Sequence, residues 1–352
     1  MEDDYANSAL GVLVVGFAGS GKSSLVQRIA AHFSAKARMS AEGNMDEGNG
    51  AVAGDNDGKP ARGASDNGQT GSGPSSSSTS PLSRGLPPYL MNLDPAVLDC
   101  PYPVNIDIRD TLSHKGVMQQ YNLGPNGAIV TALNLYATRF NDVMSIVERR
   151  AKEVSVVLMD TPGQIECFTW SASGQIIAES VASTMPSCVL FVVDGSRCAS
   201  SPRTFMSNML QACSILYKMN LPIVIAFNKC DVCDASFAKE WMSDFETFLA
   251  AMDEREKSCS ASDLSRSLCF VLDEFYNDLG CVVVSAVTGE GMDDLEKALE
   301  GARQEYMKDF LPELKMKREA RGEQERQRQQ REIERLRKDV ENLECGDADG
   351  TE

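Results

Sequence analysis

The chain has 352 residues, which at about 150 residues per domain would make two domains. Its 34 lysines and arginines are outnumbered by 51 aspartates and glutamates, so the net charge is −17 at pH 7. This excess of acid excludes binding to nucleic acid or to an anionic membrane through the overall electric field. Hydrophobic residues make up 42% of the chain, which is enough for a sizeable core and excludes disorder throughout.

The start of the chain and its cysteines indicate where the protein resides. Residues 1–4 lack the basic region of a signal peptide, and the first apolar run is too short to cross a bilayer. The 11 cysteines are odd in number and several lie in apolar runs, which favours buried reduced thiols over disulfides. We therefore expect a cytoplasmic protein without a membrane partner, and shuttling to the nucleus stays open.

The first predicted strand, residues 10–15, leads into a glycine-rich turn at residues 16–23 with the sequence Gly-Phe-Ala-Gly-Ser-Gly-Lys-Ser. This is the P-loop pattern, in which glycines let backbone N–H groups surround phosphate oxygens at the start of a helix. The lysine supplies a cation to the β and γ phosphates, and the serine after it offers a hydroxyl to Mg²⁺. The predicted nucleotide-binding residues here are Gly16, Gly19, Ser20, Gly21, Lys22, Ser23 and Ser24, with Ser23 also a metal ligand.

The composition changes abruptly at residues 34–85, where Gly, Ser, Asp, Asn and Ala dominate. Such a segment buries too little apolar area to offset the entropy lost on ordering, so we predict a disordered insertion. Residues 315–352 are dense in Arg, Lys, Glu and Gln and are predicted to form a charged helical tail with an acidic end. The remainder, residues 1–33 and 86–314, has the size of one large α/β domain, which replaces the estimate of two.

Short apolar runs recur through this remainder, at residues 10–15, 154–159, 188–193, 221–227 and 281–284, with a possible sixth at 88–93. They lack polar alternation, which is typical of strands buried on both faces of a parallel sheet. The segments between them have the spacing of helices. We predict an α/β fold, a P-loop NTPase with a doubly wound, mostly parallel sheet and helices on both faces.

The run at residues 154–159 ends in the sequence Asp-Thr-Pro-Gly-Gln, residues 160–164. In P-loop proteins an aspartate at this place lies beside Mg²⁺, and the N–H of the glycine can sense the γ-phosphate. Alone the sequence would be an ordinary turn. Together with the P-loop it predicts Asp160 as a metal-binding residue and Gly163 as a nucleotide-binding residue.

The run at residues 221–227 leads into the sequence Asn-Lys-Cys-Asp, residues 228–231. The aspartate of this N-K-x-D pattern can accept hydrogen bonds from the N1 and N2 donors of guanine, whereas adenine would leave its carboxylate unpaired. After the last run, a backbone N–H would lie near guanine O6. The predicted base-binding residues are Asn228, Lys229, Asp231, Ser285 and Ala286. The ligands that these motifs predict are GTP or GDP together with Mg²⁺.

Between the P-loop and Asp160 lies the sequence Gly-Pro-Asn-Gly, residues 124–127, which read locally is a tight turn ahead of a helix. In the context of the other motifs it resembles the GPN-loop GTPases, a family named for this tripeptide. The resemblance covers about residues 10–310 apart from the insertion. It is closest to the first of three eukaryotic branches, which is linked to the assembly and nuclear import of RNA polymerase II. The segments that carry it are residues 92–97, 124–140, 168–174 and 205–210.

The resemblance implies a dimeric GTPase in which Gly124, Pro125 and Asn126 of one subunit enter the phosphate region of its partner. There the Asn126 amide would be a preorganised hydrogen-bond donor to the charge that develops during phosphoryl transfer. Either Gln164 or Asp107 is expected to orient the attacking water, and the sequence leaves this choice open. It also leaves open whether the dimer is a homodimer or a heterodimer with another GPN-loop GTPase.

Two other functions fit parts of the pattern. A P-loop kinase acting on a nucleotide or polynucleotide end shares the P-loop but does not need the N-K-x-D motif. A GTP-binding scaffold needs the motifs but no turnover. The partners implied by the resemblance are RNA polymerase II subunits or assembly factors, without direct contact to nucleic acid. Asp94 and Asp110 are weaker candidates for metal or switch contacts, and the Cys230 and Cys233 pair is not expected to bind zinc because no second pair accompanies it.

Overall fold

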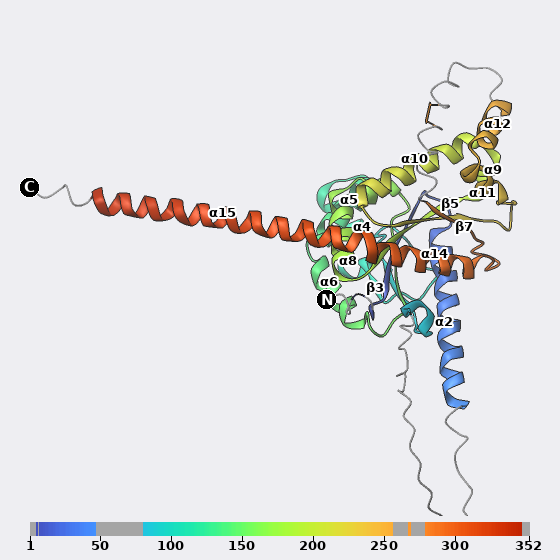
Figure 1. Ribbon diagram of the computed structural model, residues 1–352, viewed down its shortest axis with the longest axis horizontal. Coiled ribbons are helices and arrows are strands. Elements are labelled where there is room, and N and C mark those ends of the chain that lie inside the picture. Colours follow the sequence, from blue (N-terminus) through green and yellow to red (C-terminus); the bar gives the residue numbers. More distant parts are fainter. Residues whose placement is uncertain (1–4, 6, 47–79, 256–266, 269–278, 347–352) are drawn as a thin grey trace, which may run out of the picture.

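Seven parallel strands form one sheet at the centre of the molecule. The computed structural model describes residues 5, 7–46, 80–255, 267–268 and 279–346. Within them the strand order is β3-β2-β4-β1-β5-β6-β7, and all neighbouring strands pair in parallel (Figure 1). The strands are β1 (Leu10–Gly16), β2 (Tyr89–Asn92), β3 (Ile106–Asp107), β4 (Val156–Asp160), β5 (Ser187–Asp194), β6 (Ile223–Asn228) and β7 (Gly280–Val283). This confirms the predicted α/β fold.

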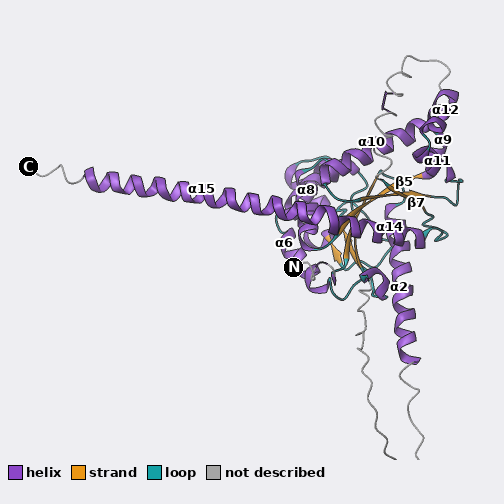
Figure 2. Cartoon of the chain, viewed as in Figure 1, coloured by secondary structure: helices purple, strands orange, loops and turns teal. Residues whose placement is uncertain are grey.

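Helices surround the sheet, as Figure 2 shows. Three of them begin in or directly after a predicted motif: α2 (Lys22–Asp46), α5 (Pro125–Ala137) and α7 (Ile165–Thr169). Helix α9 (Gly195–Ser200) follows β5, and α14 (Met292–Glu305) follows the loop after β7. The other described helices are η2 (Pro81–Arg84), α3 (Ile108–Thr111), α4 (His114–Tyr121), α6 (Phe140–Arg150), α8 (Ala172–Thr184), α10 (Pro202–Met219), α11 (Ser236–Ser243), α12 (Phe245–Arg255), η3 (Tyr306–Phe310) and α15 (Leu311–Gly346).

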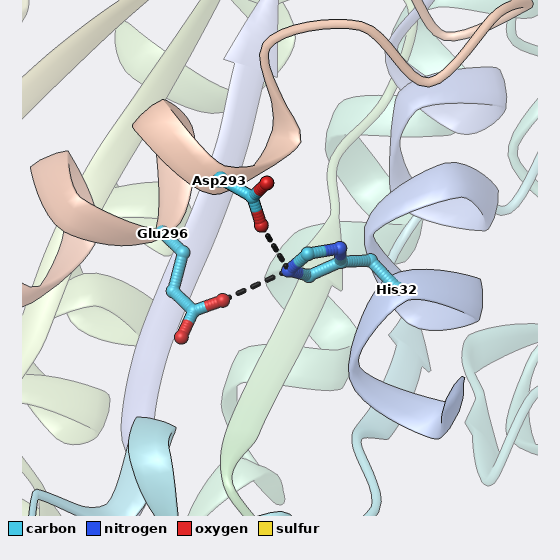
Figure 3. Close-up of side chains that lie close together, drawn as sticks. All are labelled: His32, Asp293 and Glu296. Atoms are coloured by element: carbon cyan, nitrogen blue, oxygen red, sulfur yellow. Dashed lines mark hydrogen bonds and ion pairs between the residues drawn. The ribbon is translucent and has the colours of Figure 1, made fainter. Parts of the chain in front are cut away.

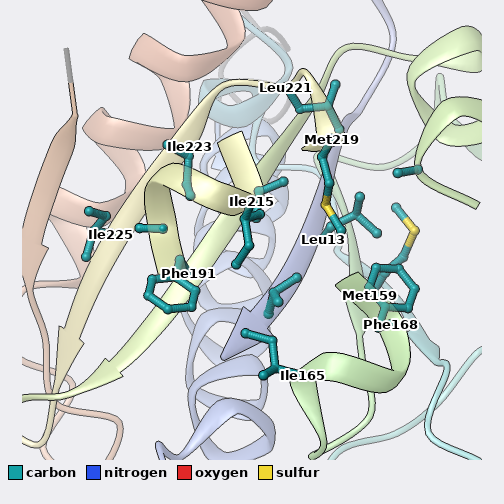
Figure 4. Close-up of a cluster of buried hydrophobic side chains, with 14 of the residues drawn as sticks. Leu13, Met159, Ile165, Phe168, Phe191, Ile215, Met219, Leu221, Ile223 and Ile225 are labelled. Carbon is teal, nitrogen blue, oxygen red and sulfur yellow. The ribbon is translucent and has the colours of Figure 1, made fainter. Parts of the chain in front are cut away.

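Each strand feeds two apolar layers because successive side chains point to opposite faces of a sheet. In β1, Leu10, Val12 and Val14 pack in the layer that contains residues of α2 and α14. Leu13 and Val15 point into the opposite layer, which contains residues of α5, α6, α8 and α10. Figure 4 shows Leu13 in this layer with Ile215 and Met219 of α10. The five named side chains of β1 are fully buried. The absence of polar alternation in these strands is therefore explained by helices on both faces.

An aromatic cluster holds α10, α11 and α12 against β6. The ring of Phe205 on α10 stacks on Phe227 of β6 at a centroid distance of 5.9 Å. The same ring lies 5.2 Å from Trp241 and 5.3 Å from Phe248. Aromatic pairs at such distances add to the free energy gained by burying their surface. Phe205 is thus the central contact between this helical corner and the sheet.

The predicted boundaries of the insertion at residues 34–85 are wrong at both ends. Helix α2 runs on to Asp46, because residues 34–46 are rich in Ala, Lys, Arg, Met and Glu, which are good helix formers. At the other end, residues 81–84 form η2, and its Leu82 is buried among residues of α2 and α14. The rest of the predicted insertion, residues 47–79, lies outside the described residues.

The C-terminal helix α15 extends away from the sheet (Figure 1). It begins at Leu311, before the predicted start of the tail at residue 315, because Leu311 is buried in the same layer as α10. Residues 315–346 continue the helix, and residues 347–352 of the predicted tail, which belong to its acidic end, lie outside the described residues. In the described part of the chain, no helix combines the length and the apolar character needed to span a membrane.

Candidate functional site

The P-loop joins β1 to α2, and its glycines adopt conformations that other residues rarely reach. Gly19 has a φ of 81° and Gly21 a φ of 89°, both in the left-handed region. A Cβ atom on Gly21 would lie only 2.5 Å from Nδ2 of Asn228. The close approach of the P-loop to the N-K-x-D motif therefore requires glycine at this position.

Lys22 is buried at the start of α2, with only 6% of its surface exposed. Its Nζ donates to the backbone oxygens of Gly16 and Phe17 at 2.8 and 3.1 Å. Burial lowers the pKa of Lys22, and the nearby carboxylates of Asp160 and Asp94 oppose this shift. The lysine is thus held across the P-loop by the backbone carbonyls of Gly16 and Phe17. A phosphate group bound in the loop would give it an anionic partner.

Asp160 ends β4 beside the P-loop and is 4% exposed. The hydroxyl of Tyr102 donates to its Oδ2 at 2.9 Å, whereas Oδ1 is buried without a hydrogen-bond partner among the described residues. Burial raises the pKa of Asp160, although hydrogen bonding by Ser23 and Tyr102 opposes the shift. A buried carboxylate oxygen without a partner, next to a serine hydroxyl, fits the oxygen ligands that Mg²⁺ prefers. Ser23 and Asp160, both predicted, are thus adjacent.

Asn228 connects the phosphate side of the site to the base side. Its Nδ2 donates to the backbone oxygen of Ser20 in the P-loop at 2.9 Å. Its Oδ1 accepts from the N–H of Ala286, which follows β7, at 3.1 Å. Three predicted motifs that are distant in the sequence therefore meet at one side chain.

Lys229 and Asp194 form a second link to the P-loop. Nζ of Lys229 donates to the backbone oxygen of Gly19 at 2.8 Å and to Oδ2 of Asp194 at 2.6 Å. Asp194 also accepts from the N–H groups of Ser196 and Arg197 and so caps α9. Sequence reasoning missed Asp194, although its position directly after the apolar run 188–193 parallels that of Asp160 after the run 154–159.

Asp231 is held by Ser285, whose hydroxyl donates to its Oδ1 at 2.7 Å. Ser285 is fully buried, whereas Asp231 is exposed, so this hydrogen bond is only partly shielded from water. It fixes one oxygen of the carboxylate and leaves the group aligned beside the loop after β7. This arrangement suits the recognition of two donors on one edge of a purine.

Switch II, the segment that follows β4, is tied to the segment after β2. The N–H of Gly163 donates to Oδ2 of Asp94 at 3.3 Å. Gln164 lines a cavity of about 590 Å³ together with P-loop residues Phe17 and Ala18 and with Arg197. Asp94 thus contacts a switch region, one of the roles considered for it, and Gln164 faces the same space as the P-loop.

Asp107 is engaged elsewhere. Its carboxylate accepts from Nε and Nη2 of Arg109, the latter at 2.6 Å, and from Nδ2 of Asn92 at 3.0 Å. Burial acts to raise the pKa of Asp107, but hydrogen bonds from Arg109 and Asn92 lower it overall. To orient a water, Asp107 would first have to leave Arg109. Asp110 lies nearby on the surface.

The Gly-Pro-Asn sequence forms the exposed N-terminus of α5. Gly124 is the residue before the helix, and Pro125 opens it, where a missing N–H costs nothing. Asn126 is exposed, and its backbone oxygen lies 3.9 Å from Sγ of Cys167 on α7. The loop therefore stands beside switch II of its own subunit with its side chains toward solvent.

A separate group of ionisable side chains joins α2 to α14 (Figure 3). Nε2 of His32 lies 2.8 Å from Glu296 and 3.8 Å from Asp293. Lys36 contacts the same carboxylate of Glu296 at 2.5 Å. Burial acts to raise the pKa of Glu296, and Lys36 and His32 lower it overall. Because a lysine already neutralises the carboxylate, we interpret the group as an ion-pair network between two helices rather than a metal centre.

Comparisons with known proteins found a matching family model, similar chains and a solved structure. A protein-family model described as a conserved hypothetical ATP binding protein matches residues 68–305. The GPN-loop GTPase QQT2 of Arabidopsis thaliana is 57% identical over 65% of this chain and 60% of that protein. GPN-loop GTPase 1 of Schizosaccharomyces pombe is 48% identical over 73% of this chain and 72% of that protein. A solved structure of a GTPase in apo form from Pyrococcus abyssi shares the fold, with a TM-score of 0.59 and 22% identity, covering 84% of this chain and 98% of that one.

Proposed function

The chain belongs to the GPN-loop GTPase family, and we propose that it binds GTP with Mg²⁺ and hydrolyses GTP to GDP and phosphate. The observation that carries this proposal is the side chain of Asn228, which bonds to the P-loop at Ser20 and to the loop after β7 at Ala286. One residue thereby links a phosphate cradle to a purine-binding edge. The carboxylate of Asp231 at that edge favours guanine over adenine.

In the proposed reaction the P-loop N–H groups and Lys22 hold the β and γ phosphates. Ser23 and Asp160 would hold Mg²⁺, which when bound neutralises the charge on the phosphate oxygens. The role of Gln164 is to orient the attacking water, because it lines the cavity beside Ala18. Asp107 would act only after it leaves its ion pair with Arg109.

The GPN loop completes the site in a dimer, with Asn126 of one subunit donating its amide to the phosphate region of the other. The exposure of residues 124–127 supports this proposal, because the loop is free to reach a partner. A donor fixed in position before the reaction stabilises developing charge without reorganisation. The partner is a second copy or another GPN-loop GTPase.

The proposed biological role is nucleotide-controlled assembly of RNA polymerase II and its import into the nucleus. Its support is the likeness to the first eukaryotic branch, which includes the relative named GPN-loop GTPase 1. The protein would act in the cytoplasm and shuttle to the nucleus. Its clients would be polymerase subunits or assembly factors rather than nucleic acid, in keeping with a net charge of −17.

Replacement of Asn126 by alanine tests the catalytic part of the proposal. We expect Asn126→Ala to bind GTP with nearly unchanged affinity and to hydrolyse it about a hundredfold more slowly, because a donor to the transition state is lost. The matched control is Asn141→Ala, an exposed asparagine that is likewise the second residue of a helix. Phosphate release under multiple turnover measures both variants.

The same assays address the other two functions. Phosphate release that never exceeds one turnover in the native chain would favour a scaffold. Equal affinity for ATP and GTP would favour a kinase. Unchanged turnover in a dimeric Asn126→Ala variant would refute the role of the amide.

A further inference from the structure

Recognition of the base depends on a short loop after β7, residues 285–291, which we call the base loop. The hydroxyl of Ser285 donates to Asp231, and the N–H of Ala286 donates to Asn228. The loop closes on itself, because the N–H of Ser285 donates to the backbone oxygen of Glu290 at 3.0 Å. Its position relative to the P-loop therefore decides whether the base and the phosphates can be bound together.

An arginine of α2, the helix that starts at the P-loop lysine, holds this loop. Nε of Arg28 donates to the backbone oxygen of Ala286 at 2.9 Å, and Nη2 donates to that of Val287. A Cβ atom built on Gly289 would lie 3.5 Å from Cδ and Nη1 of Arg28. The loop thus folds over the guanidinium. A planar fork of donors suits two successive carbonyls, which a lysine could not engage in the same way.

The contact reaches the guanine-reading carboxylate through one peptide unit. In a trans peptide the carbonyl and the next N–H point in opposite directions. Because the Val287 carbonyl faces Arg28, the N–H of Thr288 is turned away, and it donates to Oγ of Ser285 at 3.1 Å. The hydroxyl of Ser285 in turn donates a hydrogen bond to Asp231. Arg28 is thereby connected to Asp231 through three consecutive hydrogen bonds.

The helix that carries Arg28 is itself fixed against the helix that follows the base loop. His32 of α2 pairs with Glu296 of α14 (Figure 3), and Lys36 of α2 pairs with the same carboxylate. Arg28, His32 and Lys36 are spaced four residues apart, so they lie on the same side of α2 in successive turns. These ion pairs fix α2 against α14 and thereby fix the position of the Arg28 guanidinium.

We propose that Arg28 is a positioning residue for guanine recognition. It holds the base loop so that Ser285 and Ala286 stay bonded to Asp231 and Asn228 on the base side of the site, while α2 starts at the P-loop. The inference rests on the proposed binding of guanine nucleotides. It assigns selectivity for the base to a residue of the phosphate-binding helix.

Displacement of a fluorescent GDP by GDP and by ADP tests this inference in the full chain. We expect Arg28→Ala to lose about tenfold in GDP affinity, in line with hydrogen bonds to a charged group, and to change ADP affinity by less than about twofold. ADP relies on the phosphate contacts, which Arg28 does not make. Arg28→Lys should retain part of the selectivity because it can donate to one carbonyl. The control is Arg38→Ala, an exposed arginine of the same helix.

The outcomes separate the inference from the function on which it rests. Loss of GDP and ADP affinity by the same factor would mean that Arg28 only supports the fold. In that case thermal unfolding would show a lower melting temperature for the variant. Unchanged GDP affinity in Arg28→Ala would overturn the inference while leaving guanine binding intact. A native chain that does not prefer GDP over ADP would contradict both the proposed function and this inference.

Discussion

Tyr102 determines the orientation of the carboxylate that would face the metal. Its hydroxyl donates to Oδ2 of Asp160 and leaves Oδ1 without a partner among the described residues. Burial raises the pKa of Tyr102, so the phenol keeps its proton and remains a donor. Groups that orient a metal ligand commonly contribute a factor of ten or more to metal affinity.

We therefore expect Tyr102→Phe to need about tenfold more Mg²⁺ for half-maximal GTP affinity, with near-native turnover once Mg²⁺ saturates. The substitution removes one oxygen and keeps the packing of the ring, so the fold is preserved. A titration of GTP affinity against Mg²⁺ measures the effect, and Tyr121→Phe on the exposed face of α4 is the control. An identical Mg²⁺ requirement in Tyr102→Phe would contradict this role.

Single residues were predictable from the sequence where a motif has fixed spacing. The P-loop and the N-K-x-D motif are each an unbroken run of residues, and the structure brings the two runs together around Asn228. Tyr102 and Arg28 were not predicted, because each acts through a partner far away in the sequence. Asp194 was missed because a single aspartate after an apolar run has no motif of fixed spacing around it. No local pattern distinguishes Arg28 from the other arginines of the chain. Its role follows only from the contact that it makes with residues after β7.

At the level of elements, the aromatic cluster on α10 should dominate the stability of the corner that carries α11 and α12. Phe205 is fully buried and contacts Phe227, Trp241 and Phe248. Removing its ring leaves a cavity that the surrounding rings cannot fill, so we expect Phe205→Ala to lower the free energy of unfolding by about 3–5 kcal/mol.

Urea unfolding measures this loss, and Phe205→Leu should show a smaller one because more of the volume is retained. Ser207→Ala, on the exposed face of the same helix, serves as the control. A midpoint for Phe205→Ala equal to that of the control would mean that the cluster relaxes around the missing ring.

The strands were predicted best among the elements. The five main strands and the shorter β2 lie within two residues of their expected bounds. For β1, β4, β5 and β6 the reason is complete burial, because both of their faces are covered and their apolar runs are unbroken. Strand β3 has only two residues, Ile106 and Asp107, and is too short to leave a pattern. The extension of α2 to Asp46 was missed because composition was used to judge a segment whose helix propensity is high.

At the scale of the whole molecule, local charges have to overcome an unfavourable field. The chain carries a net charge of −17 and yet is proposed to bind an anionic nucleotide. Lys22 is buried at the P-loop, and Lys229 and Arg197 stand near its outer side. Interactions at short range and in a less polar environment exceed those with distant surface charges, which salt screens. The distribution of charge around the site therefore matters more than the total.

The largest structural change is expected in the assembly rather than within one chain. Gly124, Pro125 and Asn126 are exposed, and the cavity beside Gln164 and Ala18 is open to a loop from outside. A γ-phosphate held at the P-loop would give the partner's amide an anionic group to bind, so the nucleotide and the interface should stabilise each other. We expect the solution mass, measured by light scattering, to correspond to a dimer with a non-hydrolysable GTP analogue and to shift toward the monomer with GDP at low protein concentration.

The same measurement with a paralogue from another branch decides between homodimer and heterodimer. A chain that stays monomeric with the GTP analogue, alone and with paralogues, would contradict action of the GPN loop across subunits.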